Sequence, residues 1–191
     1  MIDISTPITV SFTAAFNALN LVWSKKTCTA EKAFEQIRKD TIKTDNPKIL
    51  YASVGNAEVI ALFQRRYEEQ VGLHAELPKI GRIVISRMSD ATIDALLEQE
   101  LLPKEFKTSL HANLGKIKST CSKLKIPLEV SFWPKLPTFH GFIYGNKAYI
   151  GQWIVGPFGY LSHDTHLHTL TGKKNARTIN ELISATFTIQ P

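Results

Sequence analysis

The sequence predicts one α/β domain: a sandwich with a largely parallel mixed sheet, helices on both of its faces and a C-terminal β-hairpin. Two apolar segments, residues 48–54 and 82–86, are each followed by a helical pattern, which is the order of parallel strands covered by helices. Further along, two alternating segments meet at Gly145-Asn146, and this dipeptide favours the positive φ of a hairpin turn. We assign residues 1–191 to this single domain.

Length and composition agree with an ordinary globular protein. The chain has 191 residues, the usual length of one domain, and 43% of them are hydrophobic and 21% charged. The formal charge of +6 favours acidic partners such as phosphates without demanding nucleic acid. Cys28 and Cys121 are too few and too far apart for a disulfide framework or a metal motif, so we expect buried thiols in a reducing compartment.

The beginning of the chain contains a stretch, residues 4–24, without a charged side chain. Pro7 and several Ser, Thr and Asn residues interrupt this stretch, and it lacks the basic lead-in of a signal peptide. It also lacks the roughly 20 mostly apolar residues that a spanning helix needs. We therefore expect residues 1–24 to form a buried strand and helix, in a cytoplasmic protein without a membrane segment.

The first half of the chain then alternates between strands and helices. A helix over residues 29–43 ends before Asn46-Pro47, because a residue that precedes proline is driven out of the α region. The strand at residues 48–54 leads through Gly55-Asn56 into a second helix, which Gly72 is well placed to stop. The apolar side of the first helix is expected to consist of Ala33, Phe34, Ile37 and Ile42.

The second half contains the clearest helix, whose apolar stripe keeps a 4-4-3-4-3 spacing from Phe106 to Leu124. Pro127 closes this helix, and an alternating strand follows it. In chain order we expect a strand at residues 82–86, a helix capped by Ser89 or Asp90, the helix at 104–124, a strand at 128–132, the hairpin at 139–153, a strand at 166–170 and a helix at 176–185.

Two strand ends are candidate ligand sites, since ligands of open parallel sheets sit at the carboxyl ends of the strands. At the first end the candidates are Ser53, Gly55 and Asn56, where small residues let the backbone approach a ligand. At the second end they are Arg87, which can pair with a phosphate, and Ser89. The simpler interpretation is that Gly55, Asn56 and Ser89 are turn and cap residues, and we favour it.

A basic helix and a histidine cluster are weaker candidates. Basic residues recur every seven positions from Lys104 to Lys125 and could follow a nucleic-acid backbone, but lysines beside an apolar stripe commonly form a solvated face, and we favour that interpretation. His166 and His168 would share one face of a strand about 7 Å apart. They are weak metal candidates, and polar surface histidines are the preferred interpretation. We expect no cofactor.

His140 is the main candidate for chemistry. Alternation along the hairpin places His140, Phe142 and Tyr144 on one face, and Gln152 follows the return strand. Leu128-Glu-Val-Ser-Phe132, His140 and Tyr149-Ile-Gly151 together resemble the layout of the phospholipase D-like fold. Members of that family carry His-x-Lys, an Asp near the hairpin turn and a Gly-Ser or Gly-Gly after the return strand.

This chain departs from the family pattern at each helper position. Phe142 stands at the lysine position, Gly145-Asn146-Lys147 replaces the acidic turn, and Gln152 follows Gly151. In the family the histidine attacks phosphorus and the lysine stabilises charge on the phosphoryl oxygens, so the loss of the lysine predicts a loss of turnover.

The resemblance therefore implies a non-catalytic module that binds a small anionic ligand or a protein partner at a cleft near His140, with Ser53, Arg87, Tyr144 and Gln152 among the ligand-binding candidates. Because the family builds its full site from two halves, it also implies a homodimer. Two alternatives stay open. One is a divergent phosphodiesterase or nuclease with His140 as nucleophile and Lys147 or Arg87 in place of the lysine; the other is a nucleic-acid-binding domain.

Overall fold

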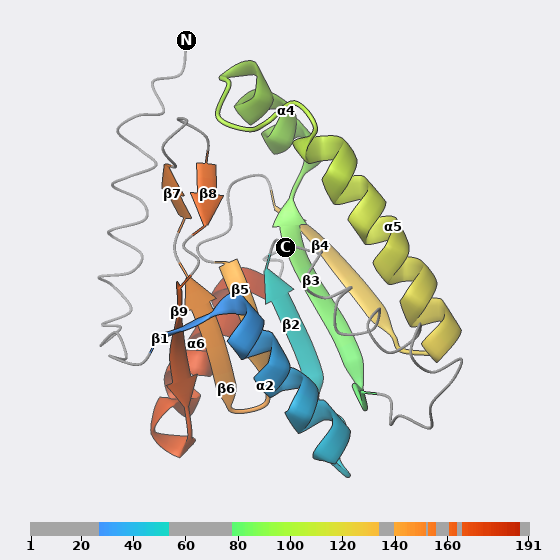
Figure 1. Ribbon diagram of the computed structural model, residues 1–191, viewed down its shortest axis with the longest axis vertical. Helices are drawn as coiled ribbons and strands as arrows, with labels where there is room; N and C mark the ends of the chain where they lie inside the picture. Colours follow the sequence, from blue (N-terminus) through green and yellow to red (C-terminus); the bar gives the residue numbers. More distant parts are fainter. Residues whose placement is uncertain are drawn as a thin grey trace.

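The described residues form an α/β fold with a seven-stranded mixed sheet and four α-helices (Figure 1). They are residues 27–53, 78–133, 140–151, 153–155, 161–163 and 166–187 of a computed structural model. The expected N-terminal strand and helix at residues 1–24, and the helix expected after residue 54, lie outside these ranges. No helix in the described part of the chain is both long and apolar enough to cross a bilayer.

The strand order of the main sheet is β1-β9-β6-β5-β2-β3-β4, and a separate two-stranded sheet pairs β7 with β8. The elements are β1 (Thr27–Thr29), α2 (Ala30–Lys43), β2 (Ile49–Ser53), β3 (Arg82–Met88), α4 (Asp90–Glu98), α5 (Phe106–Leu124), β4 (Leu128–Trp133), β5 (His140–Tyr144), β6 (Lys147–Gly151), β7 (Trp153–Val155), β8 (Leu161–His163), β9 (His166–Thr171), the 3₁₀ turn η1 (Lys173–Asn175) and α6 (Ala176–Phe187).

The sheet is mixed, as expected, but it is less parallel than expected. Strands β2, β3 and β4 are parallel, whereas the pairings β2–β5, β5–β6, β6–β9 and β1–β9 are antiparallel. Helices connect the parallel strands β3 and β4, but a tight turn at Gly145 (φ 62°) connects β5 to β6. A tight turn forces the chain to reverse, so the expected hairpin, which is confirmed, makes its half of the sheet antiparallel.

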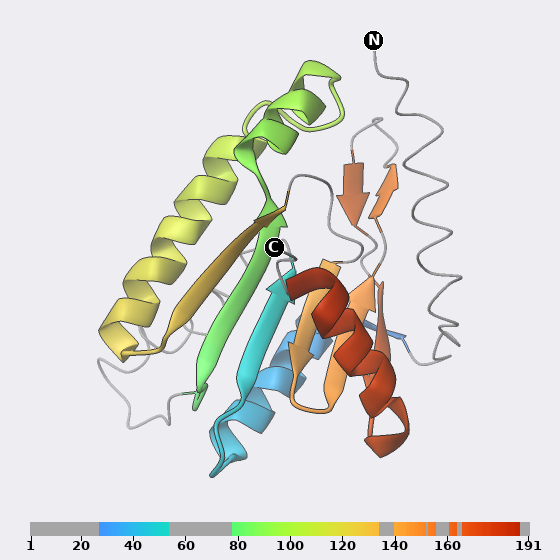
Figure 2. The ribbon, with the colours of Figure 1, turned by 180° about the vertical axis from the view of Figure 1, so that it is seen from behind.

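Helices cover both faces of the sheet. Helices α2 and α5 pack on one face, where Phe34 and Ile117 join a core cluster with the strand residues Leu50 and Ile85. Helix α6 packs on the opposite face and contributes Ile179 and Leu182 to a second cluster (Figure 2). The two faces of one strand thus supply two different cores, because successive side chains point in opposite directions.

Local signals explain where the helices begin and end. Helix α2 starts after Thr29, whose hydroxyl accepts a hydrogen bond from the Lys32 amide, and α4 starts after Ser89, which caps Thr92 in the same way. The expected apolar side of α2 needs one correction: Thr41 rather than Ile42 is fully buried, because it lies four residues after Ile37 and continues the face of Ala33 and Ile37.

Candidate functional site

Buried polar side chains gather at one end of the sheet. Seven polar or charged residues are buried in the described part of the chain, and five of them lie where the parallel strands end and β5 begins. Here β2 has the parallel neighbour β3 on one side and the antiparallel neighbour β5 on the other, and ligands of open α/β sheets bind outside the carboxyl ends of the parallel strands. The five residues are Ser53, Ser86, Arg87, Ser131 and His140.

Three of these residues form a row of serines across the parallel strands. Ser86 is in register with Ser53 on one side and with Ser131 on the other. They share the sheet face of Tyr51 and Val84, which packs against α6. The hydroxyls of Ser86 and Ser131 have no hydrogen-bond partner within the described residues, although the two side chains are 0% and 1% exposed. Buried hydroxyls are normally bonded, so this row marks an unusual polar layer.

Arg87 and His140 stand one residue beyond the serine row, on the opposite face. Ser53 pairs with Ser86 on β3 and with Gly141 on β5, so Arg87 and His140 flank the position that follows β2. With about 4.8 Å between neighbouring strands, their backbones are about 10 Å apart. The described structure therefore brings these two predicted residues onto one face, with one strand between them.

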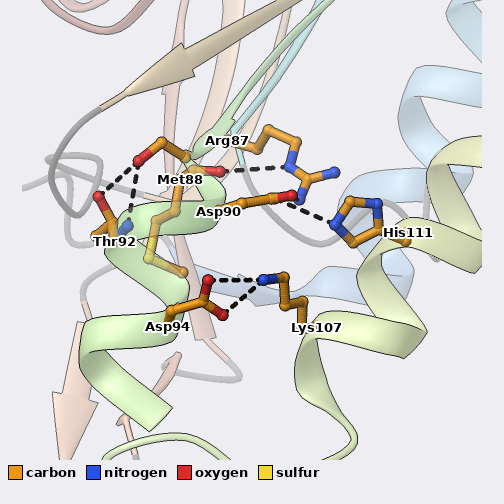
Figure 3. A network of polar contacts seen from close by, with 8 residues as sticks. Arg87, Met88, Asp90, Thr92, Asp94, Lys107 and His111 are labelled. Atoms are coloured by element: carbon orange, nitrogen blue, oxygen red, sulfur yellow. Dashed lines mark hydrogen bonds and ion pairs between the residues drawn. The ribbon is translucent and has the colours of Figure 1, made fainter. Parts of the chain in front are cut away.

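The Arg87 side chain is fully buried, with 0% exposure. Its Nε donates to the Met88 carbonyl at 3.4 Å and its Nη2 to Asp90 Oδ1 at 3.2 Å, while Nη1 has no hydrogen-bond partner in the described part of the chain (Figure 3). The ring of Phe132 lies 5.3 Å from the guanidinium carbon. Burial lowers the pKa of Arg87, and the charge of Asp90 partly opposes this shift.

One carboxylate oxygen of Asp90 contacts two partners. Its Oδ1 accepts from Arg87 and also lies 3.1 Å from Nε2 of His111, which comes from α5 (Figure 3). One turn further along α4, Asp94 holds Lys107 of α5 through both of its oxygens, at 2.6 and 2.7 Å. Two acidic residues on one face of α4 thus tie this helix to α5, one through a shared contact and one through a tight pair.

His140 is buried, with 6% exposure, and its ring lies over β6. A Cβ placed on Gly151, its register partner, would overlap with Nε2 and Cε1 of the imidazole. A side chain at residue 151 would collide with the imidazole, so this fold requires a glycine there. The resemblance matched the same residue to a glycine of the phospholipase D-like family. The ring accordingly leans towards β6 and away from Arg87.

Phe142, which the resemblance matches to a lysine, is part of the hydrophobic core. Phe142 is 3% exposed, and its ring packs edge-on against Phe34 of α2 with 4.9 Å between the ring centroids. A charged side chain at this position would have to displace the aromatic pair. The residue that replaces the lysine is thus a structural residue that anchors α2 on the sheet.

Two candidates from the sequence lie at the other end of the hairpin. The hydroxyl of Tyr144 bonds with the backbone of Lys48 and Lys79, and the Nζ of Lys147 pairs with Asp40 of α2 at 2.6 Å. His140 pairs with Gly151, four residues along β6 from Lys147. Tyr144 and Lys147 thus lie at the end of the hairpin opposite to His140, and both have partners there.

Among the remaining candidates, some have a structural role and others lie outside the described residues. Ser89 caps α4, as the simpler interpretation held. Gly55, Asn56 and Gln152 lie outside the described residues. His166 and His168 both lie on β9, and the described part of the chain holds no group of three or more His, Cys, Asp or Glu side chains that could bind a metal.

Sequence reasoning missed three contributors to this layer: Ser131, Phe132 and the Asp90–His111 contact. One signal could have revealed the serine row, since each of the three parallel strands changes from apolar residues to a serine near its end. Nothing in the sequence could have paired Asp90 with His111, because that contact depends on how α4 and α5 pack.

Comparisons with known proteins returned no significant match to a family model, to a curated protein or to a solved structure.

Proposed function

We propose that this chain is a non-catalytic, phospholipase D-like module that binds a small anionic ligand at the carboxyl ends of its parallel strands, with Arg87 as the residue that carries the ligand's charge. The observation that carries the proposal is the incomplete pairing of the buried Arg87 guanidinium. A protein partner that presents a carboxylate or phosphate is the second occupant that the same chemistry would accept.

A fully buried guanidinium normally has well-placed partners, because removing a charge from water costs on the order of several kcal/mol. Arg87 has one carboxylate contact at 3.2 Å and one carbonyl contact at 3.4 Å. Charge-assisted bonds of this kind are usually about 2.7–2.9 Å long, and arginine favours two parallel bonds to one anion. A small oxyanion that accepts from Nη1 would supply what the described residues do not.

The position of the site supports the same conclusion. Arg87 comes directly after the serine row, at the edge of the sheet where β2 changes from a parallel to an antiparallel neighbour. The sandwich of helices around this sheet, with a histidine opening the hairpin beside the first parallel strand, is consistent with the phospholipase D-like layout. Fold analogy is a weak warrant for function, so the proposal rests on Arg87 rather than on the resemblance.

The surroundings of His140 support a site without turnover. The lysine position is occupied by the buried Phe142, and Lys147 is committed to Asp40. A phosphoryl group at His140 would therefore receive no charge stabilisation in the transition state from either of these two positions. A homodimer that pairs two such sites remains part of the proposal, and light scattering in solution measures it.

The test of anion binding is a titration with inorganic phosphate, followed by calorimetry at constant ionic strength. We expect Arg87→Gln to weaken phosphate binding at least about tenfold, the effect of losing one charge-assisted bond of about 1.5–3 kcal/mol. Arg82→Gln is the matched control, because Arg82 lies at the opposite end of the same strand, is 46% exposed and pairs with Glu129. Equal affinity in the two variants would refute the role of Arg87.

A divergent phosphodiesterase is the second candidate function, and the placement of Arg87 on the same sheet face as His140 is the observation in its favour. It predicts turnover of a simple phosphodiester that His140→Ala abolishes while the folded state persists. Such turnover would overturn the non-catalytic proposal, and the absence of both turnover and a trapped phosphohistidine would overturn the enzyme.

A further inference from the structure

We propose that Asp90 is an internal competitor for the anion site: its carboxylate occupies the ligand's position at Arg87 in the free protein and moves wholly to His111 when the ligand binds. The inference rests on the proposed function, because it assumes that Arg87 binds an anion. It adds a regulatory residue on α4 and a requirement on the charge of the ligand.

The exposed fractions of the side chains indicate that an incoming ion meets Asp90 before Arg87. The Arg87 side chain is fully covered, while Asp90 and His111 are both 48% exposed. In Figure 3 the Asp90 side chain lies between the guanidinium and the imidazole of His111. An anion that approaches from the α4–α5 side therefore meets the carboxylate of Asp90 next to Arg87.

The contact between Asp90 and Arg87 is built in a way that allows displacement. Only Oδ1 of Asp90 is engaged, and it serves Arg87 at 3.2 Å and His111 at 3.1 Å. Both distances exceed the roughly 2.7–2.9 Å of a strong charge-assisted bond. A ligand that makes two bonds to the guanidinium would therefore replace one long bond, and His111 would retain the released carboxylate.

The helices need not move apart when this contact opens. Asp94 and Lys107 hold α4 against α5 through two short bonds, one turn away from Asp90. The apolar residues Ile93, Leu96 and Leu110 also form a core cluster between the two helices. Displacement of Asp90 would therefore move only its side chain, while α4 and α5 keep their positions.

Competition with a carboxylate also constrains the ligand. A neutral ligand cannot replace the negative charge of Asp90 beside the buried guanidinium, so the ligand must be an anion. Two acceptor oxygens on one atom match Nη1, which has no partner among the described residues, and Nη2, which Asp90 would release. We therefore assign the site to oxyanions with two such acceptor oxygens, and inorganic phosphate is the probe.

The experiment compares Asp90→Asn with Asp94→Asn in calorimetric titrations with phosphate at constant ionic strength. Both residues lie on α4, are about half exposed and pair with α5, and both changes remove one negative charge. We expect Asp90→Asn to bind phosphate about tenfold more tightly than the unmodified protein, the equivalent of one bond of about 1.4 kcal/mol, and Asp94→Asn to differ from it by less than about twofold. Thermal unfolding of each variant verifies that it is folded.

A second variant should change the phosphate affinity in the opposite direction. His111→Ala removes the partner that retains the displaced carboxylate, so phosphate affinity should fall by about threefold or more. If the unmodified protein binds phosphate but Asp90→Asn binds it no more tightly, the Asp90 inference is wrong and the proposed function stands. If neither the unmodified protein nor Asp90→Asn binds phosphate, the proposed function itself fails.

Discussion

The imidazole of His140 lies over the α-carbon of Gly151, and a side chain on that glycine would occupy the space of the ring. The two residues are register partners on β5 and β6, so their contact is a direct result of the hairpin. A Gly at this position is thus required by the buried histidine, whatever chemistry the histidine performs. This relationship is open to a direct test of stability.

Gly151→Ala should lower the free energy of unfolding by about 1–3 kcal/mol, because the new methyl group forces the ring or the backbone to shift. Chemical denaturation measures the change. The control is Gly115→Ala on α5, where an added Cβ meets nothing within 4 Å and should stabilise the helix by about 0.5–1 kcal/mol.

A double variant shows whether the histidine is the cause. His140→Ala combined with Gly151→Ala should cost less than the sum of the two single changes, because the collision disappears with the ring. Strict additivity would mean that the Leu167 side chain, which also lies near this position, is the obstacle instead.

A lysine in place of Phe142 should destabilise the protein. Phe142→Lys removes a buried ring from its contact with Phe34 and places a charge in the core, so we expect a loss of about 3–5 kcal/mol and no phosphodiester turnover. Denaturation and an assay with a phosphodiester measure the two effects. Phe142→Leu, which keeps the site apolar, should cost clearly less; a stable Phe142→Lys protein with turnover would contradict the assignment of this residue to the core.

The serine row should tolerate the loss of its unpartnered hydroxyls. Ser86→Ala and Ser131→Ala should leave the stability unchanged or raise it by up to about 1 kcal/mol, because burying a hydroxyl without a bond is costly. Thr41→Val is the control: the Thr41 hydroxyl is buried but donates to the Arg38 carbonyl at 2.8 Å, so its loss should cost about 0.5–1.5 kcal/mol. A loss of stability in the serine variants that equals the loss in the control would mean that their hydroxyls are bonded.

Stability should fall at alkaline pH because of Cys121. Burial raises the pKa of this thiol to about 11, whereas an unfolded cysteine has a pKa of about 8.5. Between these values the unfolded chain loses the proton and the folded chain keeps it, so unfolding becomes more favourable as the pH rises. The stability that the protonated Cys121 thiol contributes to the folded state is fully present below about pH 8.5 and is lost as the pH approaches 11.

Denaturation between pH 8 and 10.5 measures this dependence, and Cys121→Val should flatten it while preserving an apolar side chain at the site. Tyr149 contributes in the same direction at higher pH, since burial raises its pKa to about 12. An unchanged slope in Cys121→Val would show that the thiol is not the titrating group.

The sequence by itself determined most of the described elements, though not the short strands β1 and β8, because the signals of the longer elements are local. The apolar stripe from Phe106 to Leu124 indicates one buried helix face, Ser89 indicates a helix start, and the turn at Gly145 indicates a hairpin. The same local patterns also placed His140 and Phe142 on one face of β5. Each of these inferences uses residues of a single element or turn, whose geometry the backbone alone sets.

The tertiary structure decided which residues meet. Lys147 was a candidate to serve His140 but pairs with Asp40, 107 residues away in the chain. Asp90 meets His111 because α4 packs on α5. The serines of three strands form a row because those strands pair in one register. Periodicity tells which face of an element is buried, but the neighbours of that face depend on packing between distant segments, and the candidate site is made of such neighbours.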